Sequence, residues 1–141
     1  MSLTVETVRT DRPAPSHLAS HLGYWLRYVS NHVSQAFARK VEHEGVTVAE
    51  WVVLRALYDQ DELAPSRLAR NLDLTRGALS KLADRLQAKS LIVRRDNEGD
   101  GRAHLVALSP AGRDLVPKLS ALADQNDAEF FGHLTERSEA H

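Results

Sequence analysis

The first apolar pattern along the chain has the spacing of a long amphipathic helix. Apolar side chains recur three or four residues apart at Leu18, Leu22, Trp25, Val29, Val33 and Phe37. Because this spacing puts them on one face of a helix, we predict a helix over residues 17–43. Its apolar stripe is wider than packing against one other element of a small domain requires. Glu44 and Gly45 end the pattern in a loop.

Three shorter helical segments follow this first pattern. Thr47 and Glu50 have the spacing of a capping box, and the helix they begin carries the apolar residues Trp51, Leu54, Leu57 and Tyr58. A short helix is expected from Pro65, since proline suits the first helical position. Thr75 is a natural N-cap for the next helix, whose apolar stripe consists of Ala78, Leu79, Leu82 and Leu86. Two helices joined by a tight turn at this point predict a helix-turn-helix.

The pattern then changes to two short runs rich in branched apolar residues, at 91–95 and 104–108. The stretch 96–103 between them is rich in turn-forming residues, which predicts a β-hairpin. Ser109 and Pro110 are typical of a new helix start, and Pro117 within that helix predicts a kink or a 3₁₀ turn. The expected fold is therefore mainly α with a small β-hairpin wing: a winged helix-turn-helix between long N- and C-terminal helices.

The 141 residues suit a single domain preceded by an arm. Residues 1–16 mix charges with two prolines and lack the apolar core of a signal peptide, so we expect a flexible arm there. Residues 17–141 would form one domain, with a winged lobe over about 47–108 and candidate dimerisation helices over 17–43 and 110–141. The chain has no cysteine, which excludes disulfides and thiolate metal sites. No apolar run approaches the roughly 20 residues needed to cross a bilayer, so a cytoplasmic protein with no membrane contact is expected.

Charge is distributed unevenly. The whole chain carries a formal net charge of −1, whereas residues 65–104 contain nine basic and five acidic residues. A local excess of positive charge attracts a polyanion even where the whole chain is nearly neutral. This segment is therefore a candidate nucleic-acid-binding surface. An unevenly charged solvated surface would give the same count, and charge alone leaves both interpretations open.

The wing carries the most specific motif of the chain. Asp100-Gly101-Arg102 is followed by a strand, then by Leu108-Ser109 and a helix start at Pro110. This order resembles the wing of the MarR family of bacterial transcriptional regulators. The segments 47–54 and 65–69 are similar to the second and third helices of that family.

The resemblance extends from about Leu18 to Phe131. The chain departs from the family at 132–141, a short polar tail where members usually close with a further helix that joins the first helix in a dimer interface.

The resemblance implies sequence-specific binding to double-stranded DNA. The helix after Thr75 would enter the major groove, where Thr75, Arg76 and Ser80 would contact base edges. Arg76 would be the strongest contact, because arginine pairs bidentately with guanine. Arg102 at the wing tip would enter the minor groove, held in place by Asp100. The expected phosphate contacts are Ser66, Lys81, Arg85, Arg94 and Arg95.

Plainer roles remain open for several of these residues. Ser66 and Thr75 can act as helix caps alone, and Asp100 with Arg102 can form a surface ion pair worth roughly 0–1 kcal/mol. Arg94 and Arg95 can lie on a solvated strand. Asp84, on the same helix as Arg76, would repel phosphate unless it faces away or pairs with Lys81 or Arg85.

The family also implies an assembly and a mode of control. Two copies about 34 Å apart would reach successive major grooves of a pseudo-palindromic operator, as a homodimer that represses transcription. A small aromatic or phenolic ligand would release the dimer from DNA. The candidate ligand-binding residues are Trp25, Tyr28, His32, Trp51 and Arg55, with Arg55 pairing a ligand carboxylate. Packing in the core is the alternative for both tryptophans.

Other function classes find little support in the sequence. No phosphate-binding loop, nucleophile elbow or catalytic cysteine is present, so no enzyme and no cofactor are expected. His17 and His21 lie four residues apart without an evident third ligand, which favours exposed histidines over a metal site. The main alternative is a winged-helix module that docks a protein partner. Such a surface would need apolar anchors, whereas residues 75–85 present a polar, basic outer face.

Overall fold

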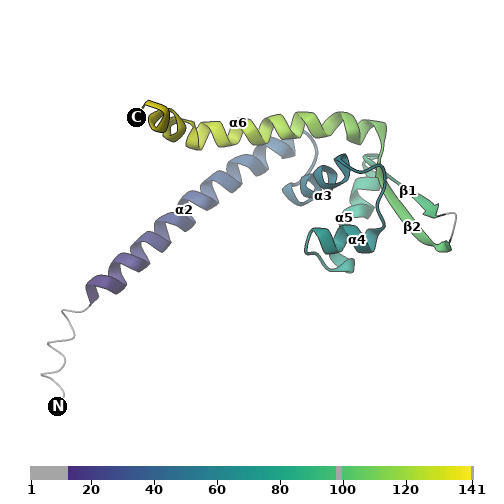
Figure 1. Cartoon of the computed structure of the whole chain (residues 1–141), viewed down its shortest axis with the longest axis horizontal. Coiled ribbons are helices and arrows are strands. Elements are labelled where there is room, and N and C mark those ends of the chain that lie inside the picture. Colours follow the sequence, from purple (N-terminus) through teal and green to yellow (C-terminus); the bar gives the residue numbers. More distant parts are fainter. Residues whose placement is uncertain (1–12, 98–99, 141) are drawn as a thin grey trace, which may run out of the picture. The chain divides into compact units, whose positions relative to one another are not determined.

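The computed structural model describes the backbone of residues 13–97 and 100–140 and the side chains of residues 21–95 and 104–132. Its elements are, in order, α2 (Pro13–His43), α3 (Val48–Tyr58), α4 (Pro65–Asn71), α5 (Arg76–Ala88), β1 (Ile92–Asn97), β2 (Asp100–Leu108) and α6 (Pro110–Ala140) (Figure 1). The two strands form one antiparallel sheet. The predicted fold class, mainly helical with a β-hairpin wing, is confirmed.

The chain divides into two compact units, Met1–Ala36 and Phe37–His141, and the boundary lies inside α2. In the first unit α2 begins at Pro13, earlier than the predicted start at residue 17, because proline is accepted in the first helical turn. The last four residues of the predicted arm are therefore helical. The rest of that arm, residues 1–12, lies outside the described residues.

The helix ends follow the local chemistry of the sequence. The amide of Glu50 donates to Thr47 Oγ1 (3.1 Å), and the amide of Thr47 donates to Glu50 Oε1 (2.8 Å). This reciprocal pair is the predicted capping box of α3. Thr75 caps α5 by accepting from the amide of Ala78 at 3.0 Å. All these contacts use neighbours within three residues, which explains why the sequence predicts them.

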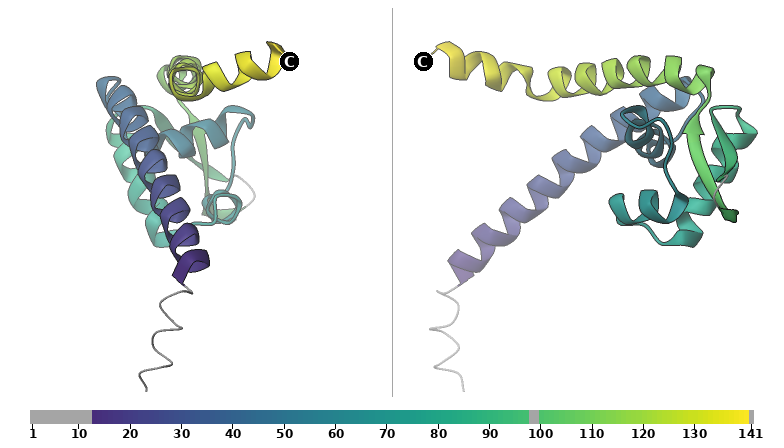
Figure 2. Two further views of the ribbon diagram at one scale, coloured as in Figure 1. Left: turned by 90° about the vertical axis from the view of Figure 1, so that its left-hand side faces the viewer. Right: turned by 45° about the vertical axis from the view of Figure 1, so that its right-hand side comes forward.

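The second unit has one apolar core, to which every helix and the hairpin contribute. Its buried members are Val41, Val46, Val53, Leu54, Leu57, Leu68, Ala69, Leu79, Ala83, Leu86, Ile92, Val106, Leu108, Val116 and Leu119. Figure 2 shows α3, α4 and α5 grouped beside the hairpin, with α6 leaving from the end of β2. From α5 only Leu79, Ala83 and Leu86 are fully buried. The helix is thus anchored along one narrow face, to which the half-buried Leu82 adds, and its polar side is left to solvent.

The hairpin is longer than predicted. Its ladder runs from Ile92 opposite Leu108 to Asn97 opposite Asp100, with an irregularity between Asp96 and Asn97. Most of the predicted loop 96–103 is therefore strand. Once the apolar ends of the two strands are paired, each further residue adds ladder hydrogen bonds, which polar residues can make as well as apolar ones.

Leu63 extends this small sheet. Its amide and carbonyl both bond to Val106, at 2.9 and 2.8 Å, in an isolated antiparallel bridge. The sequence shows only Leu63 and Ala64 as apolar residues at that point, between an acidic run and Pro65. The bridge fixes the segment that leads into α4 against the wing.

The last helix, α6, is α-helical throughout its 31 residues. The 3₁₀ turn offered as one expectation at Pro117 is not formed. Pro117 is exposed, and a proline removes a single backbone donor from the helix, so the carbonyl one turn earlier can bond to water. The polar tail from Gly132 continues the same helix as far as Ala140.

Candidate nucleic-acid interface

The exposed side chains of α5 are polar or basic near its start. Arg76 is the first residue of the helix, and Thr75, Arg76, Ser80, Lys81 and Arg85 are all exposed. The N-cap Oγ1 of Thr75 is occupied by the amide of Ala78, so its capping role is established. A polar helix held by one buried face and open on the other has the form that a major-groove helix requires.

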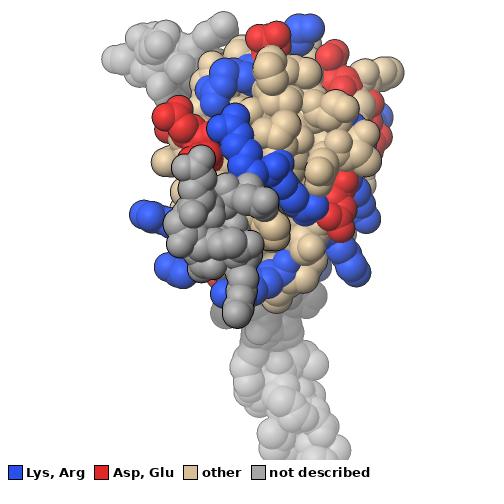
Figure 3. All heavy atoms as spheres, turned by 90° about the vertical axis from the view of Figure 1, so that its right-hand side faces the viewer, with Lys and Arg blue, Asp and Glu red and all other residues tan. Residues whose placement is uncertain are grey.

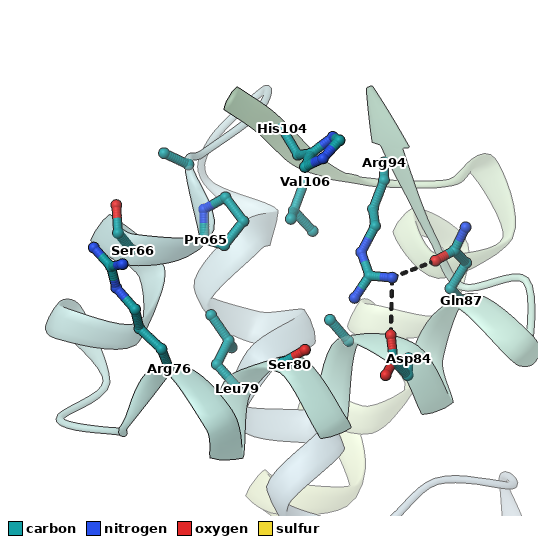
Figure 4. A pocket seen from close by; sticks show the side chains of 12 residues that line it. Pro65, Ser66, Arg76, Leu79, Ser80, Asp84, Gln87, Arg94, His104 and Val106 are labelled. Atoms are coloured by element: carbon teal, nitrogen blue, oxygen red, sulfur yellow. Dashed lines mark hydrogen bonds and ion pairs between the residues drawn. The ribbon is translucent and has the colours of Figure 1, made fainter. Parts of the chain in front are cut away.

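An open hollow of about 810 Å³ lies between α4, α5 and the hairpin. It is lined by Ala64, Pro65, Ser66, Arg76, Leu79, Ser80, Ala83, Asp84, Gln87, Arg94, His104 and Val106. In Figure 4 Ser66 and Arg76 stand at one end of the hollow, and Asp84, Gln87 and Arg94 stand at the other. Ser66, Arg76, Ser80 and Arg94 were each predicted to contact DNA, and the fold brings all four to this surface. Ser66 itself is half-buried.

Arg94 is held against α5. Its Nη1 lies 2.9 Å from Asp84 Oδ1 and donates to Gln87 Oε1 at 2.8 Å (Figure 4). The partner of Asp84 is thus an arginine of the wing, and not Lys81 or Arg85 on its own helix. This pair joins β1 to the helix that carries the predicted base contacts.

Other basic residues of the segment 65–104 are also paired with acids. Arg95 Nη1 lies 3.6 Å from Glu62 Oε2, and Lys89 Nζ lies 2.7 Å from Glu50 Oε1. Glu62 and Glu50 both lie outside residues 65–104, the segment whose basic excess suggested a nucleic-acid-binding surface. The basic excess that faces solvent is therefore smaller than the sequence count, and among the described residues it is carried by Arg67 and Arg70 of α4 and by Arg76, Lys81 and Arg85 of α5.

Figure 3 shows the face of the second unit at the hairpin end. Lys and Arg side chains form a band across this face, and Asp and Glu side chains lie toward its margins. The backbone of Asp100 and Arg102 lies in β2, but their side chains are outside those that the structure describes. The predicted contact of Arg102 with the minor groove remains a prediction, as does its ion pair with Asp100.

A family model and several known proteins match the chain. The model of the MarR family matches residues 44–103, from the loop after α2 into β2. The HTH-type transcriptional repressor MdtR of Bacillus subtilis is 28% identical over 119 residues, which cover 84% of this chain and 77% of MdtR. The chain belongs to the MarR family. It is a transcriptional regulator rather than an enzyme.

Solved structures of MarR-type proteins agree with this assignment. A crystal structure of the S. aureus MepR–DNA complex has a TM-score of 0.70 and 26% identity, and the match covers 84% of this chain and 90% of that one. A structure of Bordetella bronchiseptica BpsR, whose DNA binding is regulated by 6-hydroxynicotinic acid, has a TM-score of 0.68 and 28% identity. That match covers 78% of this chain and 79% of BpsR.

The five predicted ligand residues of this MarR-family chain fall in two groups. Trp25, Tyr28 and His32 belong to the first unit, where Tyr28 contacts both other rings edge to face, with centroids 5.5 and 4.5 Å apart. Trp51 and Arg55 belong to the second unit. Trp51 is half-buried against the core, and Arg55 pairs with Asp59 at 3.0 Å. Arg55 also lines a shallow hollow beside α6.

His17 and His21 were not expected to bind a metal ion. The side chain of His17 lies outside the side chains that the structure describes. His21 Nε2 accepts a hydrogen bond from Trp25 Nε1 at 2.8 Å. No group of three or more potential metal-ligating residues occurs among the described residues. In the same part of the chain no helix is long and apolar enough to span a bilayer.

Sequence reasoning missed three connections of the winged lobe: the Leu63 bridge, the Arg94–Asp84 pair and the Glu50–Lys89 pair. Each joins residues on different elements. The one local signal was Glu50, which a capping box places at the start of α3. Nothing in the spacing indicates that Lys89, 39 positions later, is its partner.

Proposed function

We propose that this MarR-family regulator binds a pseudo-palindromic operator as a homodimer and represses transcription. The observation that carries the proposal is the exposed, polar start of α5 beside the hairpin, where Thr75, Arg76 and Ser80 can approach base edges. Lys81, Arg85, Arg95 and Ser66 surround this position as phosphate contacts. MepR, which has the same fold, has been solved with DNA.

The exposed face of α2 supports the homodimer. Leu22, Tyr24, Trp25, Leu26, Tyr28 and Val29 are between 41% and 71% exposed in the single chain. An apolar patch of this size on a helix is typical of a protein interface. Phe131 on α6 is 41% exposed as well. A second copy would cover both surfaces and set two copies of α5 for successive major grooves.

Control by a small aromatic acid is the finer part of the proposal. Within the first unit, the cluster of Trp25, Tyr28 and His32 offers ring faces and edges for an aromatic ligand. BpsR, whose DNA binding is regulated by 6-hydroxynicotinic acid, is a structural neighbour. Trp25 and Trp51 are the only tryptophans of the chain, so intrinsic fluorescence would report a ligand at the predicted residues.

Selection of bound fragments from the source genome tests the proposed function, with footprinting of the selected site and sedimentation of the free protein. We expect two inverted half-sites with centres about 10 base pairs apart, and a dimer in solution. Selected fragments without a common sequence would overturn sequence-specific binding and favour a winged-helix module that docks protein. A monomer that protects one half-site would overturn the homodimer alone.

A further inference from the structure

Asp84 is unusual for its place in the molecule. It is the one acidic residue of α5, whose other charged residues are Arg76, Lys81 and Arg85. Its side chain is 65% exposed, on the helix that carries the proposed base contacts. A carboxylate there opposes the approach of a polyanion. We therefore looked for a favourable interaction of Asp84 that offsets its repulsion of DNA phosphates.

The partner of Asp84 provides that interaction. Arg94 leaves β1 and turns toward α5, where Nη1 contacts both Asp84 Oδ1 (2.9 Å) and Gln87 Oε1 (2.8 Å) (Figure 4). Asp84 and Gln87 are three residues apart, so they are neighbours on one helix face. The Arg94 side chain is only 29% exposed in this position. A phosphate could bind Arg94 fully only by competing with both partners.

Contacts to phosphate strengthen binding to every sequence alike, whereas contacts to base edges distinguish sequences. We propose that Asp84 withholds Arg94 from the DNA backbone and thereby lowers the affinity for DNA of every sequence, the operator and unrelated duplexes alike. This inference rests on the proposed DNA-binding function. It also assigns Arg94 a different role from the phosphate contact that the sequence suggested.

The size of the effect follows from counterion release. Each phosphate that a protein neutralises steepens the dependence of log K on log salt by about 0.9. If Asp84→Asn frees Arg94 for one phosphate, the slope steepens by about that amount. With the two proteins taken as equal at 1 M salt, the variant then binds a duplex about eight-fold more tightly than wild type at 0.1 M salt. A brace that merely kept the wing in place would act in the opposite direction, since its loss would weaken binding to all DNA.

The test measures fluorescence anisotropy of an unrelated duplex and of the selected operator at several salt concentrations. Wild type is compared with Asp84→Asn, Arg94→Gln, the double variant and Asp73→Asn. Asp73 is the matched control, because it is an exposed acid just before α5, and it forms no ion pair with any residue that the structure describes. Its φ of 58° is a conformation that asparagine tolerates well.

At 0.1 M salt we expect Asp84→Asn to bind the unrelated duplex and the operator each about eight-fold more tightly than wild type does, with a steeper salt slope and an unchanged operator preference. Arg94→Gln alone should change binding to unrelated DNA little, and in the double variant the gain should disappear. Three results would overturn the inference: weaker or unchanged binding by Asp84→Asn, a gain that survives Arg94→Gln, or an equal gain from Asp73→Asn, which would reflect bulk charge.

Failure of this inference can be told apart from failure of the proposed function. A wild-type protein that prefers its operator, with an Asp84→Asn variant that behaves like wild type, removes only the role of Asp84. A wild-type protein that binds all duplexes equally, or none, removes sequence-specific binding and the inference with it.

Discussion

Lys89 Nζ lies 2.7 Å from the buried Glu50 Oε1 and 2.9 Å from the carbonyl oxygen of Gly45. One ammonium group thus joins the end of α5 to the first turn of α3 and to the loop after α2. Burial raises the pKa of Glu50, but hydrogen bonds from Lys89 and the Thr47 amide, with the charges of Lys89 and Arg85, outweigh it, and the net pKa is below the usual value. The ion pair holds the end of α5 that lies away from the proposed base contacts.

Removal of the Lys89 charge should destabilise the fold. In Lys89→Met the buried carboxylate of Glu50 would lose the counterion that contacts it, and we expect the free energy of unfolding to fall by about 3 kcal/mol. Urea denaturation at neutral pH measures this change. Lys81→Met, which removes an exposed lysine of the same helix, is the control and should change stability little. Equal losses in the two variants would contradict the role of the ion pair.

Acid should reveal the same interaction. Because the pKa of Glu50 is lower in the folded protein than in the unfolded chain, its ionised form stabilises the fold at pH values above the usual glutamate pKa of about 4.5. That contribution is lost as the pH falls through the lowered folded-state pKa. The stability difference between wild type and Glu50→Gln should therefore be constant near neutral pH and shrink below about pH 4.5. A difference that does not depend on pH would show that the Glu50 charge contributes nothing.

The winged lobe separates what a sequence can predict from what it cannot. The Thr47–Glu50 box, the Thr75 cap and the start of α6 depend on neighbours within three residues, and the sequence specifies all of them. Lys89 and Arg94 look like ordinary cations of a basic segment, because their acid partners come from other elements. The hairpin was predicted too short for a related reason. Ladder hydrogen bonds come from the backbone, and residues 96–97 and 100–103 include no large apolar side chain that would indicate a strand.

Gly112 is needed where α6 begins against the wing. A Cβ at this position would lie 2.1 Å from the carbonyl oxygen of Leu91, so Gly112→Ala must move the helix or the strand. We expect a loss of about 2 kcal/mol in the free energy of unfolding. Gly132→Ala is the matched control in the same helix, since its Cβ would meet only Ala128 Cβ at 4.0 Å. That variant should be neutral or slightly stabilising, and a neutral Gly112→Ala would refute the close approach.

Ser90 gives a prediction of opposite sign. It follows α5 with a φ of 62°, a left-handed conformation that costs a residue with a Cβ about 1 kcal/mol. Ser90→Gly keeps the backbone bond from the Leu91 amide to the Leu86 carbonyl (2.9 Å) and should raise the melting temperature. Ser90→Ala keeps the Cβ and should show no such gain. If both variants melt at the same temperature, the conformation at Ser90 stores no strain.

Arg76 tests base contact at the start of α5. Arg76→Ala removes an exposed side chain, so thermal unfolding should be almost unchanged while the preference for operator over unrelated DNA falls by about 1–3 kcal/mol. Arg39→Ala removes another exposed arginine, from α2, and controls for net charge. Competition binding with both duplexes supplies the comparison. An equal fall in the Arg39→Ala variant would mean that Arg76 contributes charge alone.

The most direct test of the central claim is binding to a fluorescent duplex that carries the DNA upstream of the protein's own coding sequence. Binding of wild type and of the wing variant Arg102→Ala is measured at several salt concentrations, and a scrambled duplex serves as the control. Sequence-specific regulation predicts tight binding to the upstream duplex, a steep fall with salt, and weaker binding by Arg102→Ala. Equal and weak binding to both duplexes, followed by a genome-wide selection that yields no preferred fragment, would contradict it.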